Sequence, residues 1–250
     1  MFDYIFTMKF KFNKDFRKFT AGDTVDIPIS DDITWVVGSN GSGKSTLMKI
    51  LREQKDSLHD LLEHRRDGYM HKDTDIRELK PEDVTVETPD YPHRFFLDAV
   101  ADDPNSLWNS ASAYSFLSGG GRDMQSISKG EKSFTMLANF IKDATKVVGN
   151  PEDLLKKMTE DKDFIPEFNL VVLDEIDEGM DLKSQAKLPS VLDRLSITLM
   201  AKIVVITHSI MIPIFAGAKT VFDMDTRSVV SVEEYMTRLT GKNIKITVTE

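Results

Sequence analysis

The chain has 250 residues, of which 40% are hydrophobic and 29% are charged, and its formal net charge is −9. This length and composition are ordinary for a folded globular protein, and they exclude a disordered chain, a collagen and a disulfide-stabilised scaffold. The absence of cysteine excludes a thiolate metal site and a cysteine nucleophile, and it is typical of a reducing compartment. No apolar run approaches the ~20 residues that span a bilayer. We therefore expect a soluble, cytoplasmic, single-domain protein.

The first part of the chain predicts strands followed by one helix. Apolar residues alternate with polar ones over residues 6–12 and again over residues 25–29, which is the pattern of antiparallel strands with one buried face. The continuous apolar run at residues 33–37 is typical of a strand buried on both faces. After a glycine-rich loop, apolar side chains at helical spacing indicate a helix over residues 47–65.

Further buried strands and helices alternate along the rest of the chain. We expect a strand at residues 84–86, the start of a helix at residues 95–100, a helix over residues 128–147, buried strands at residues 170–173 and 203–206 with a helical stretch at residues 182–195 between them, and a hairpin over residues 221–232. This alternation predicts an α/β fold with a mainly parallel core sheet. The N-terminal strands are expected to run antiparallel to one another.

A complete phosphate-binding pattern, G-x-x-x-x-G-K-[ST], follows the predicted strand at residues 33–37. It consists of Gly38, Ser39, Asn40, Gly41, Ser42, Gly43, Lys44 and Ser45, with Thr46 next. Glycines let backbone N–H groups curl around phosphate oxygens, and the start of the following helix favours negative charge. In such a loop Lys44 neutralises the β- and γ-phosphates of a nucleotide, and the Ser45 hydroxyl binds Mg²⁺. A flexible glycine- and serine-rich linker is the alternative, and the flanking strand and helix argue against it.

Two carboxylates end the predicted strand at residues 170–173. Asp174 lies at the strand tip, where it is placed to hold Mg²⁺. Glu175 follows one position further, where it can accept a proton from an attacking water. Polar residues are common at strand ends, so the pair indicates little by itself. Together with the phosphate loop it predicts an ATPase site.

The segment Ser128-Lys129-Gly130-Glu131 opens the helix predicted at residues 128–147. A capping box accounts for Ser128 and Glu131, because each side chain can accept a hydrogen bond from the other residue's backbone N–H. It does not account for Gly130, because glycine lowers helix stability. A glycine here lets another group approach the backbone closely, and the start of a helix attracts anions.

Five motifs in one order resemble those of the ATP-binding-cassette (ABC) ATPases. They are a Walker A motif at 38–46, a signature motif at 127–131, a Walker B motif at 170–175, a D-loop at 177–181 and a switch histidine, His208, after the last core strand. The resemblance implies a P-loop NTPase fold of ABC type, in which the N-terminal antiparallel strands form a β lobe beside the mainly parallel core sheet. It divides the chain into a nucleotide-binding α/β core, residues 1–83 and 169–250, and a helical subdomain that carries the signature, residues 84–168.

This resemblance implies an enzyme that converts ATP and water to ADP and phosphate with Mg²⁺. Lys44, Glu175 and His208 are the catalytic residues that it implies, with Glu175 as the base and His208 as a hydrogen-bond partner of the γ-phosphate. Ser45 and Asp174 are the implied metal ligands.

The resemblance also implies a homodimer that forms on ATP binding. In ABC ATPases two cassettes pack head to tail around the nucleotide, and the dimer opens when hydrolysis removes the contacts of the γ-phosphate. The phosphates bound by one copy would then face the signature of the other, which consists of Ser128, Lys129, Gly130 and Glu131. Asp181 of the D-loop would support the facing site.

Two features of the family are missing from the sequence. ABC cassettes carry a Q-loop glutamine after a strand between the Walker A and signature motifs, but no glutamine follows the strand predicted at residues 84–86. The aromatic residue that often stacks on adenine also stays unassigned. Phe12, Phe16 and Phe19 are candidates, and each is better explained as a core residue.

Two observations favour heads of the SMC and RecF kind over transporter cassettes. Residues 174–177 read Asp-Glu-Ile-Asp, whereas transporter cassettes usually read Asp-Glu-Pro. The missing glutamine is the second, because transporter cassettes use it to couple to membrane helices. Against this preference, no heptad pattern of a coiled-coil arm lies between the Walker motifs.

A basic strip near the N-terminus bears on the partner of such an ATPase. It consists of Lys9, Lys11, Lys14, Arg17 and Lys18. Clustered cations dominate affinity for nucleic acid, but a solvated strand face is the favoured explanation of the strip. From the preference for SMC- and RecF-like heads we expect a role in DNA processing or as an SMC- or RecF-like switch. A transporter subunit with a membrane partner, and a free-standing cassette that regulates a protein partner, are the alternatives.

Overall fold

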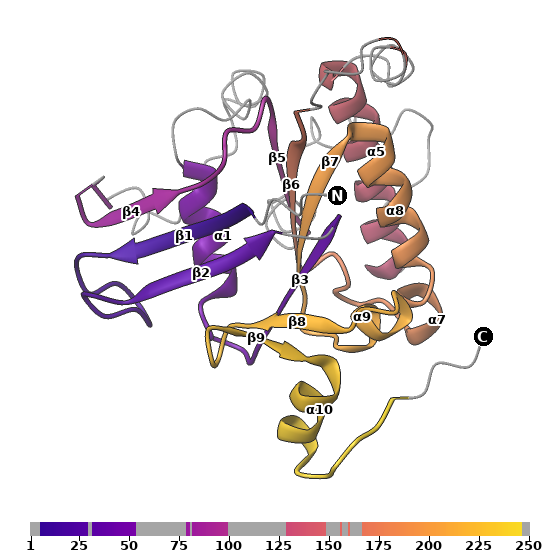
Figure 1. Ribbon diagram of the computed structural model, residues 1–250. Helices are drawn as coiled ribbons and strands as arrows, with labels where there is room; N and C mark the ends of the chain where they lie inside the picture. Colours follow the sequence, from indigo (N-terminus) through magenta and orange to yellow (C-terminus); the bar gives the residue numbers. More distant parts are fainter. Residues whose placement is uncertain are drawn as a thin grey trace.

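Six strands form the core sheet of the computed structural model, in the order β5-β6-β7-β3-β8-β9 (Figure 1). The structure describes residues 6–29, 32–53, 79–80, 82–99, 129–148, 156, 160 and 167–246. The sheet strands are β3 (Ile33–Val37), β5 (Arg94–Asp98), β6 (Asn169–Asp174), β7 (Ala201–Ile206), β8 (Thr220–Asp223) and β9 (Ser228–Ser231). Neighbouring strands pair in parallel from β5 to β8, and β9 pairs antiparallel with β8. The predicted mainly parallel core sheet is therefore confirmed.

Three further strands form the predicted antiparallel lobe, in the order β2-β1-β4. They are β1 (Phe6–Phe12), β2 (Thr24–Ile29) and β4 (Val84–Glu87). Met8, Phe10 and Phe12 are buried, whereas the residues between them are exposed or half-buried. This alternation confirms the two-residue period of the sequence, because successive side chains of a strand point to opposite faces.

Helices and the lobe cover opposite faces of the core sheet. Helix α1 (Lys44–Glu53) and the lobe pack on one face, in a core that includes Val36 of β3. Helices α5 (Lys129–Val148) and α8 (Leu188–Leu199) pack on the other face, in a core that includes Val37. Figure 1 shows the lobe on one side of the sheet and α5 with α8 on the other side. The remaining helices are α7 (Leu182–Gln185), α9 (Met211–Phe215) and α10 (Val232–Thr240).

The prediction that a helix starts at residues 95–100 was wrong. Residues 94–98 form strand β5, which pairs in parallel with β6 along its whole length. A short apolar run such as Phe95-Phe96-Leu97 fits a buried strand and a buried helix equally well, so its period cannot decide between them. Here the pairing with β6, the strand of the Walker B motif, makes this segment a strand. The pairing also places the end of β5 at the candidate site.

Some of the predicted elements lie partly outside the described residues. Helix α1 is described as far as Glu53, so its predicted extension to residue 65 lies outside them. Of the predicted helical subdomain, β4 pairs with the lobe, β5 belongs to the core sheet and α5 is a long helix. The subdomain itself stays a prediction. Among the helices that the structure describes, none has the length and apolar character needed to cross a bilayer.

Candidate active site

The parallel strands bring the predicted site residues to one edge of the core sheet. Asp174 at the end of β6 lies opposite Asp98 of β5 on one side and Ile206 of β7 on the other. The phosphate loop, residues 38–43, follows β3, which pairs with β7. Ligands of open α/β sheets bind outside the carboxyl ends of the strands. The fold therefore places the two Walker motifs and the switch histidine where a ligand is expected.

The path of the phosphate loop depends on glycine at two positions. Gly43 has a φ of 100°, and a Cβ atom there would lie 2.6 Å from Cζ of Phe19. Gly38 has a φ of 151°, and a Cβ atom there would lie 2.9 Å from the Ser42 hydroxyl oxygen. Larger residues would strain the backbone and displace these neighbours. The two glycines of the motif are thus required by the local packing.

The side chain of Lys44 forms hydrogen bonds with the residues of the phosphate loop. Its Nζ donates hydrogen bonds to the carbonyl oxygens of Gly38 and Ser39, at 2.8 and 3.0 Å, and to the Ser42 hydroxyl at 3.3 Å. Burial lowers the pKa of Lys44, while the carboxylates of Asp225, Asp174 and Glu175 act in the opposite direction. The ammonium group is therefore held at the loop by backbone carbonyls and surrounding negative charge.

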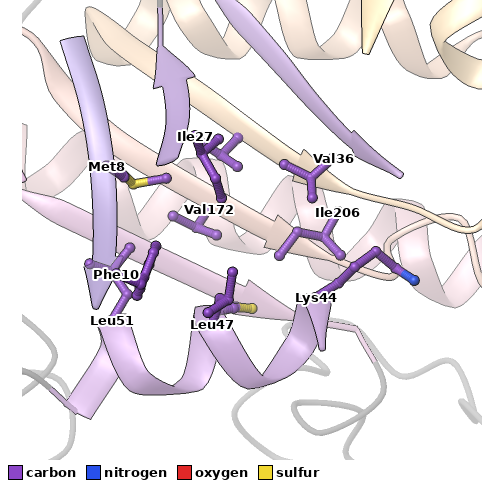
Figure 2. Close-up of a pocket in the computed structure, with 11 residues that line it drawn as sticks. Met8, Phe10, Ile27, Val36, Lys44, Leu47, Leu51, Val172 and Ile206 are labelled. Atoms are coloured by element: carbon purple, nitrogen blue, oxygen red, sulfur yellow. The ribbon is translucent and has the colours of Figure 1, made fainter. Parts of the chain in front are cut away.

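The stem of Lys44 borders a small apolar void beneath the loop. Figure 2 shows the Lys44 nitrogen pointing away from the other labelled side chains, among them Leu47, Val172 and Ile206. The void is about 10 Å³, which is at the lower limit for one water molecule, and its lining is apolar apart from Lys44. It is a packing defect between the lobe, α1 and the core sheet, and not a ligand site.

Glu175 and His208 form a pair beside Lys44. Nε2 of His208 lies 3.0 Å from Oε1 of Glu175, and Nδ1 of the same ring lies 3.4 Å from Nζ of Lys44. An ammonium group only donates, so Nδ1 is the acceptor in any hydrogen bond with Lys44, and in that tautomer Nε2 donates to Glu175. Glu175 has a φ of 52°, a left-handed conformation that is costly for residues other than glycine. The structure therefore holds this carboxylate in a strained position at the end of β6.

Asp174 and Asp98 are two buried carboxylates at the ends of neighbouring strands. The pKa of Asp174 is raised to about 7, chiefly by burial and then by the charge of Asp98, and a hydrogen bond with the Ser45 side chain partly opposes this rise. Oδ1 of Asp174 is buried and has no hydrogen-bond partner among the described residues. An unpartnered carboxylate oxygen beside a hydroxyl and a second carboxylate is an oxygen donor set of the kind that Mg²⁺ prefers. The residues present therefore fit the predicted magnesium ion.

Asp98 is a site residue that the sequence analysis did not identify. It ends β5, the strand that pairs with β6, and its side chain is buried. In the helix start predicted at residues 95–100, Asp98 would not have lain at the end of a strand. The signal was present in the sequence as a carboxylate directly after a short apolar run, the same pattern that identified Asp174.

The described part of the signature motif packs against the segment that follows Walker B. A Cβ atom on Gly130 would lie 3.3 Å from the carbonyl oxygen of Gly179 and from Cα of Met180, and the Ser133 hydroxyl donates to the Glu178 carbonyl at 3.4 Å. This close contact within the chain explains why residue 130 is a glycine. Lys129 begins α5 and Glu131 is exposed in its first turn. Ser128, and with it the predicted capping box, lies outside the described residues.

Asp181 of the predicted D-loop caps helix α7. Its Oδ1 accepts a hydrogen bond from the backbone N–H of Ser184 at 2.7 Å, and this bond lowers the pKa of the carboxyl. Next to it, Gln185 donates to the Met180 carbonyl at 3.1 Å and accepts from the Ser209 hydroxyl at 2.6 Å. The D-loop segment is thereby linked to the residue that follows His208.

A hollow of about 330 Å³ lies between these two segments. Its lining is mainly acidic and polar and consists of Glu175, Asp177, Glu178, Gly179, Met180, Gln185, His208 and Ser209. The Glu175–His208 pair therefore opens onto a surface depression rather than onto the apolar core.

The aromatic candidates for adenine stacking are Phe12 at the end of β1 and Phe16 and Phe19 in the connection from β1 to β2. Phe12 and Phe19 are buried and stack on each other, with ring centroids 4.1 Å apart. They are core residues, as the sequence analysis favoured. Phe16 is half-buried beneath the guanidinium of Arg17, which also donates to the Thr46 hydroxyl at 3.3 Å. This segment therefore covers the start of α1, a contact that the sequence analysis did not identify.

Comparison with known proteins identifies the fold. No protein-family model and no curated protein matches the sequence. The structure of CbiO1 from Clostridium perfringens, part of an ABC transporter complex, is 17% identical with a TM-score of 0.51, over 94% of this chain and 92% of that chain. A nucleotide-free ATP-binding cassette from an ABC transporter is 14% identical with a TM-score of 0.50, over 95% of this chain and 96% of that chain. The SMC head domain from Thermotoga maritima has a TM-score of 0.43 at 17% identity, over 88% and 94% of the two chains.

The chain therefore has the fold of ABC ATPase cassettes. Its mostly parallel sheet, its antiparallel lobe and the position of its phosphate loop are those that the resemblance in the sequence implied. At these identities the likeness defines the fold alone. The preference for SMC and RecF heads over transporter cassettes stays a prediction.

The raised pKa of Asp174 makes stability depend on pH. A carboxyl whose pKa rises on folding destabilises the folded state progressively as pH rises from its ordinary pKa of 3.8 toward about 7. We expect Asp174→Asn to stabilise the metal-free protein, with a gain larger by about 1–2 kcal/mol at about pH 8.5 than at about pH 5.5. Urea unfolding at the two pH values measures this difference. The exposed Asp193→Asn is the control, and an equal gain for Asp174→Asn at both pH values contradicts the prediction.

Proposed function

We propose that this chain binds Mg-ATP and hydrolyses it to ADP and phosphate. The observation that carries the proposal is the cluster of Lys44, Glu175 and His208, whose side chains meet within hydrogen-bond distance although they come from three separate segments. An ammonium group, an imidazole and a carboxylate beside a phosphate loop are the groups that phosphoryl transfer to water requires.

The phosphate loop and the carboxylates beside it bind the nucleotide and the metal ion in this reaction. The phosphate loop, residues 38–46, binds the phosphate chain through its backbone N–H groups, and Lys44 neutralises the β- and γ-phosphates. Ser45 and Asp174, with Asp98 beside them, would hold the Mg²⁺, which would compensate the phosphate charge.

Glu175 and His208 act on the attacking water and the γ-phosphate. The water oxygen bonds to the γ-phosphorus while the bond to the β–γ bridging oxygen breaks, and ADP leaves with that electron pair. Glu175 accepts the proton of the water. The imidazole of His208 contacts Glu175 when no nucleotide is bound. When ATP is bound, the imidazole donates a hydrogen bond to a γ-phosphate oxygen instead.

Replacement of the proposed base tests the activity. We expect Glu175→Gln to reduce Mg²⁺-dependent phosphate release by roughly 100-fold or more, because general-base catalysis contributes about 10²–10⁴. The amide keeps the size of the side chain, so binding of ATP should persist. Glu234→Gln, an exposed change on α10, is the matched control. Equal phosphate release by wild-type protein and Glu175→Gln would exclude the assigned role.

We further propose that two copies pack head to tail around ATP. This proposal rests on the order of the motifs, with the signature residues Ser128, Lys129, Gly130 and Glu131 facing the phosphates of the other copy and Asp181 supporting the facing site. The hollow beside Glu175 and His208 leaves that site open toward a neighbouring surface. The contacts between the signature of one copy and the γ-phosphate bound by the other exist only in the closed dimer, so release of the γ-phosphate favours opening.

Trapping the nucleotide tests the dimer. We expect Glu175→Gln with Mg-ATP to have twice its monomer mass of 28.3 kDa in light scattering, because unhydrolysed ATP holds both copies together. The same protein with Mg-ADP should remain monomeric. A monomer under both conditions contradicts the head-to-tail arrangement.

DNA processing is the role that we propose for this switch. Four cations of the basic strip, namely Lys11, Lys14, Arg17 and Lys18, are exposed. Lys14 approaches Asp83 at 3.9 Å, which is weak pairing for an exposed residue. Such a strip fits phosphate backbones. The alternatives are a transporter subunit, as in the complex to which CbiO1 belongs, and a cassette that regulates a protein partner.

Anisotropy of labelled single- and double-stranded DNA tests this role. We expect the Glu175→Gln protein to bind DNA more tightly with Mg-ATP than without it, with affinity that falls as salt rises. Lys11→Glu combined with Lys14→Glu should weaken binding by about tenfold or more, since each lost phosphate contact lowers affinity. Lys219→Glu with Lys242→Glu is a control of equal charge on exposed positions elsewhere. Absence of DNA binding in both nucleotide states excludes the role and leaves the two alternatives.

A further inference from the structure

The turn between β8 and β9 contacts the phosphate loop directly. The carboxylate of Asp225 accepts a hydrogen bond from the backbone N–H of Ser39 at 2.7 Å and another from the Ser39 hydroxyl at 2.6 Å. Ser39 is the second residue of the Walker A motif, 186 positions away in the sequence. A hairpin turn does not need this carboxylate for its own geometry, because both hydrogen bonds leave the hairpin.

Asp225 is held in place by a support that does not involve the loop. Asp223, which is fully buried, accepts hydrogen bonds from the Asp225 backbone N–H at 3.0 Å and from the Thr226 hydroxyl at 2.7 Å. Arg238 of α10 forms an ion pair with Asp223. The backbone N–H of Met224 donates to the carbonyl of Val37, the residue before the loop, at 2.8 Å. The turn is therefore fixed both to α10 and to the end of β3.

The charge of Asp225 acts on the cation at the centre of the loop. Among the charged neighbours that oppose the lowered pKa of Lys44, Asp225 has the largest effect. Burial raises the pKa of Asp225, but the hydrogen bonds from Ser39 and the charges of Lys18 and Lys44 outweigh it, so the pKa lies below its ordinary value. Asp225 is thus ionised at neutral pH, close to the proposed place of the phosphates.

We propose that Asp225 is a positioning residue of the phosphate loop, with two opposing effects on nucleotide affinity. Its hydrogen bonds hold Ser39 and the first limb of the loop in the conformation that receives phosphate. Its negative charge competes with the phosphates for Lys44 and weakens their binding. The inference rests on the proposed binding of Mg-ATP and adds a residue that none of the sequence motifs contains.

Two substitutions separate the two effects. Asp225→Asn removes the charge but can still bond to Ser39, whereas Asp225→Ala removes both. We expect Asp225→Asn to bind a fluorescent Mg-ATP analogue about 3–10-fold more tightly than wild-type protein, a gain that shrinks as salt rises because screening weakens the lost repulsion. We expect Asp225→Ala to bind at least about fivefold more weakly than Asp225→Asn, because alanine loses the hydrogen bonds to Ser39 that the asparagine amide can still make.

Two controls separate the effect on nucleotide affinity from effects of net charge and of folding. Asp193→Asn makes the same charge change at an exposed position on α8 and should leave the affinity unchanged. Thermal melting verifies that each variant is folded, and Asp225→Ser replaces Asp225→Ala if the latter melts early.

Two kinds of failure are distinguishable. Wild-type protein that does not bind Mg-ATP contradicts the proposed function and this inference together. If wild-type protein binds, equal affinities of wild-type protein and Asp225→Asn, or of Asp225→Asn and Asp225→Ala, overturn the inference alone.

Discussion

The parallel register of the core sheet is the constraint on which the candidate site depends. Asp98, Asp174 and the segments after β3 and β7 come from distant parts of the sequence, and they meet because the strands end at the same edge. Apolar side chains are buried on both faces of the sheet, and a shift of one residue along a strand would turn every side chain to the opposite face and disrupt this packing. The polar groups of the site are thus positioned by apolar packing elsewhere in the sheet.

Negative charge is concentrated at this edge of the sheet, and the raised pKa of Asp174 reflects the free-energy cost of burying it. Asp98 and Asp174 are both buried, and their charges oppose each other. Such an arrangement disfavours the metal-free folded state unless a proton or a cation compensates it. A site of this kind gains its binding energy for a divalent cation partly by relieving repulsion that folding created.

The sequence predicts the fold class and the Walker motifs well, because both depend on local patterns. The phosphate loop is one continuous stretch, and the two-residue alternation of β1 marks its buried face. Asp98 and Asp225 were missed for different reasons. A five-residue strand has too few residues for its period to show, and a turn carboxylate is recognisable as part of a site only when its partner, Ser39, is known to lie beside it. Long-range contacts of single polar residues leave no pattern in a single sequence.

The contact of Gly130 with Gly179 and Met180 connects the start of α5 with the segment after β6. The backbone at residue 130 lies so close to residues 179–180 that a Cβ atom would be only 3.3 Å from them. Gln185 connects this segment in turn to Ser209, the neighbour of His208, through hydrogen bonds with Met180 and Ser209. The first turn of α5 and the imidazole of the candidate site are therefore joined by a short series of direct contacts.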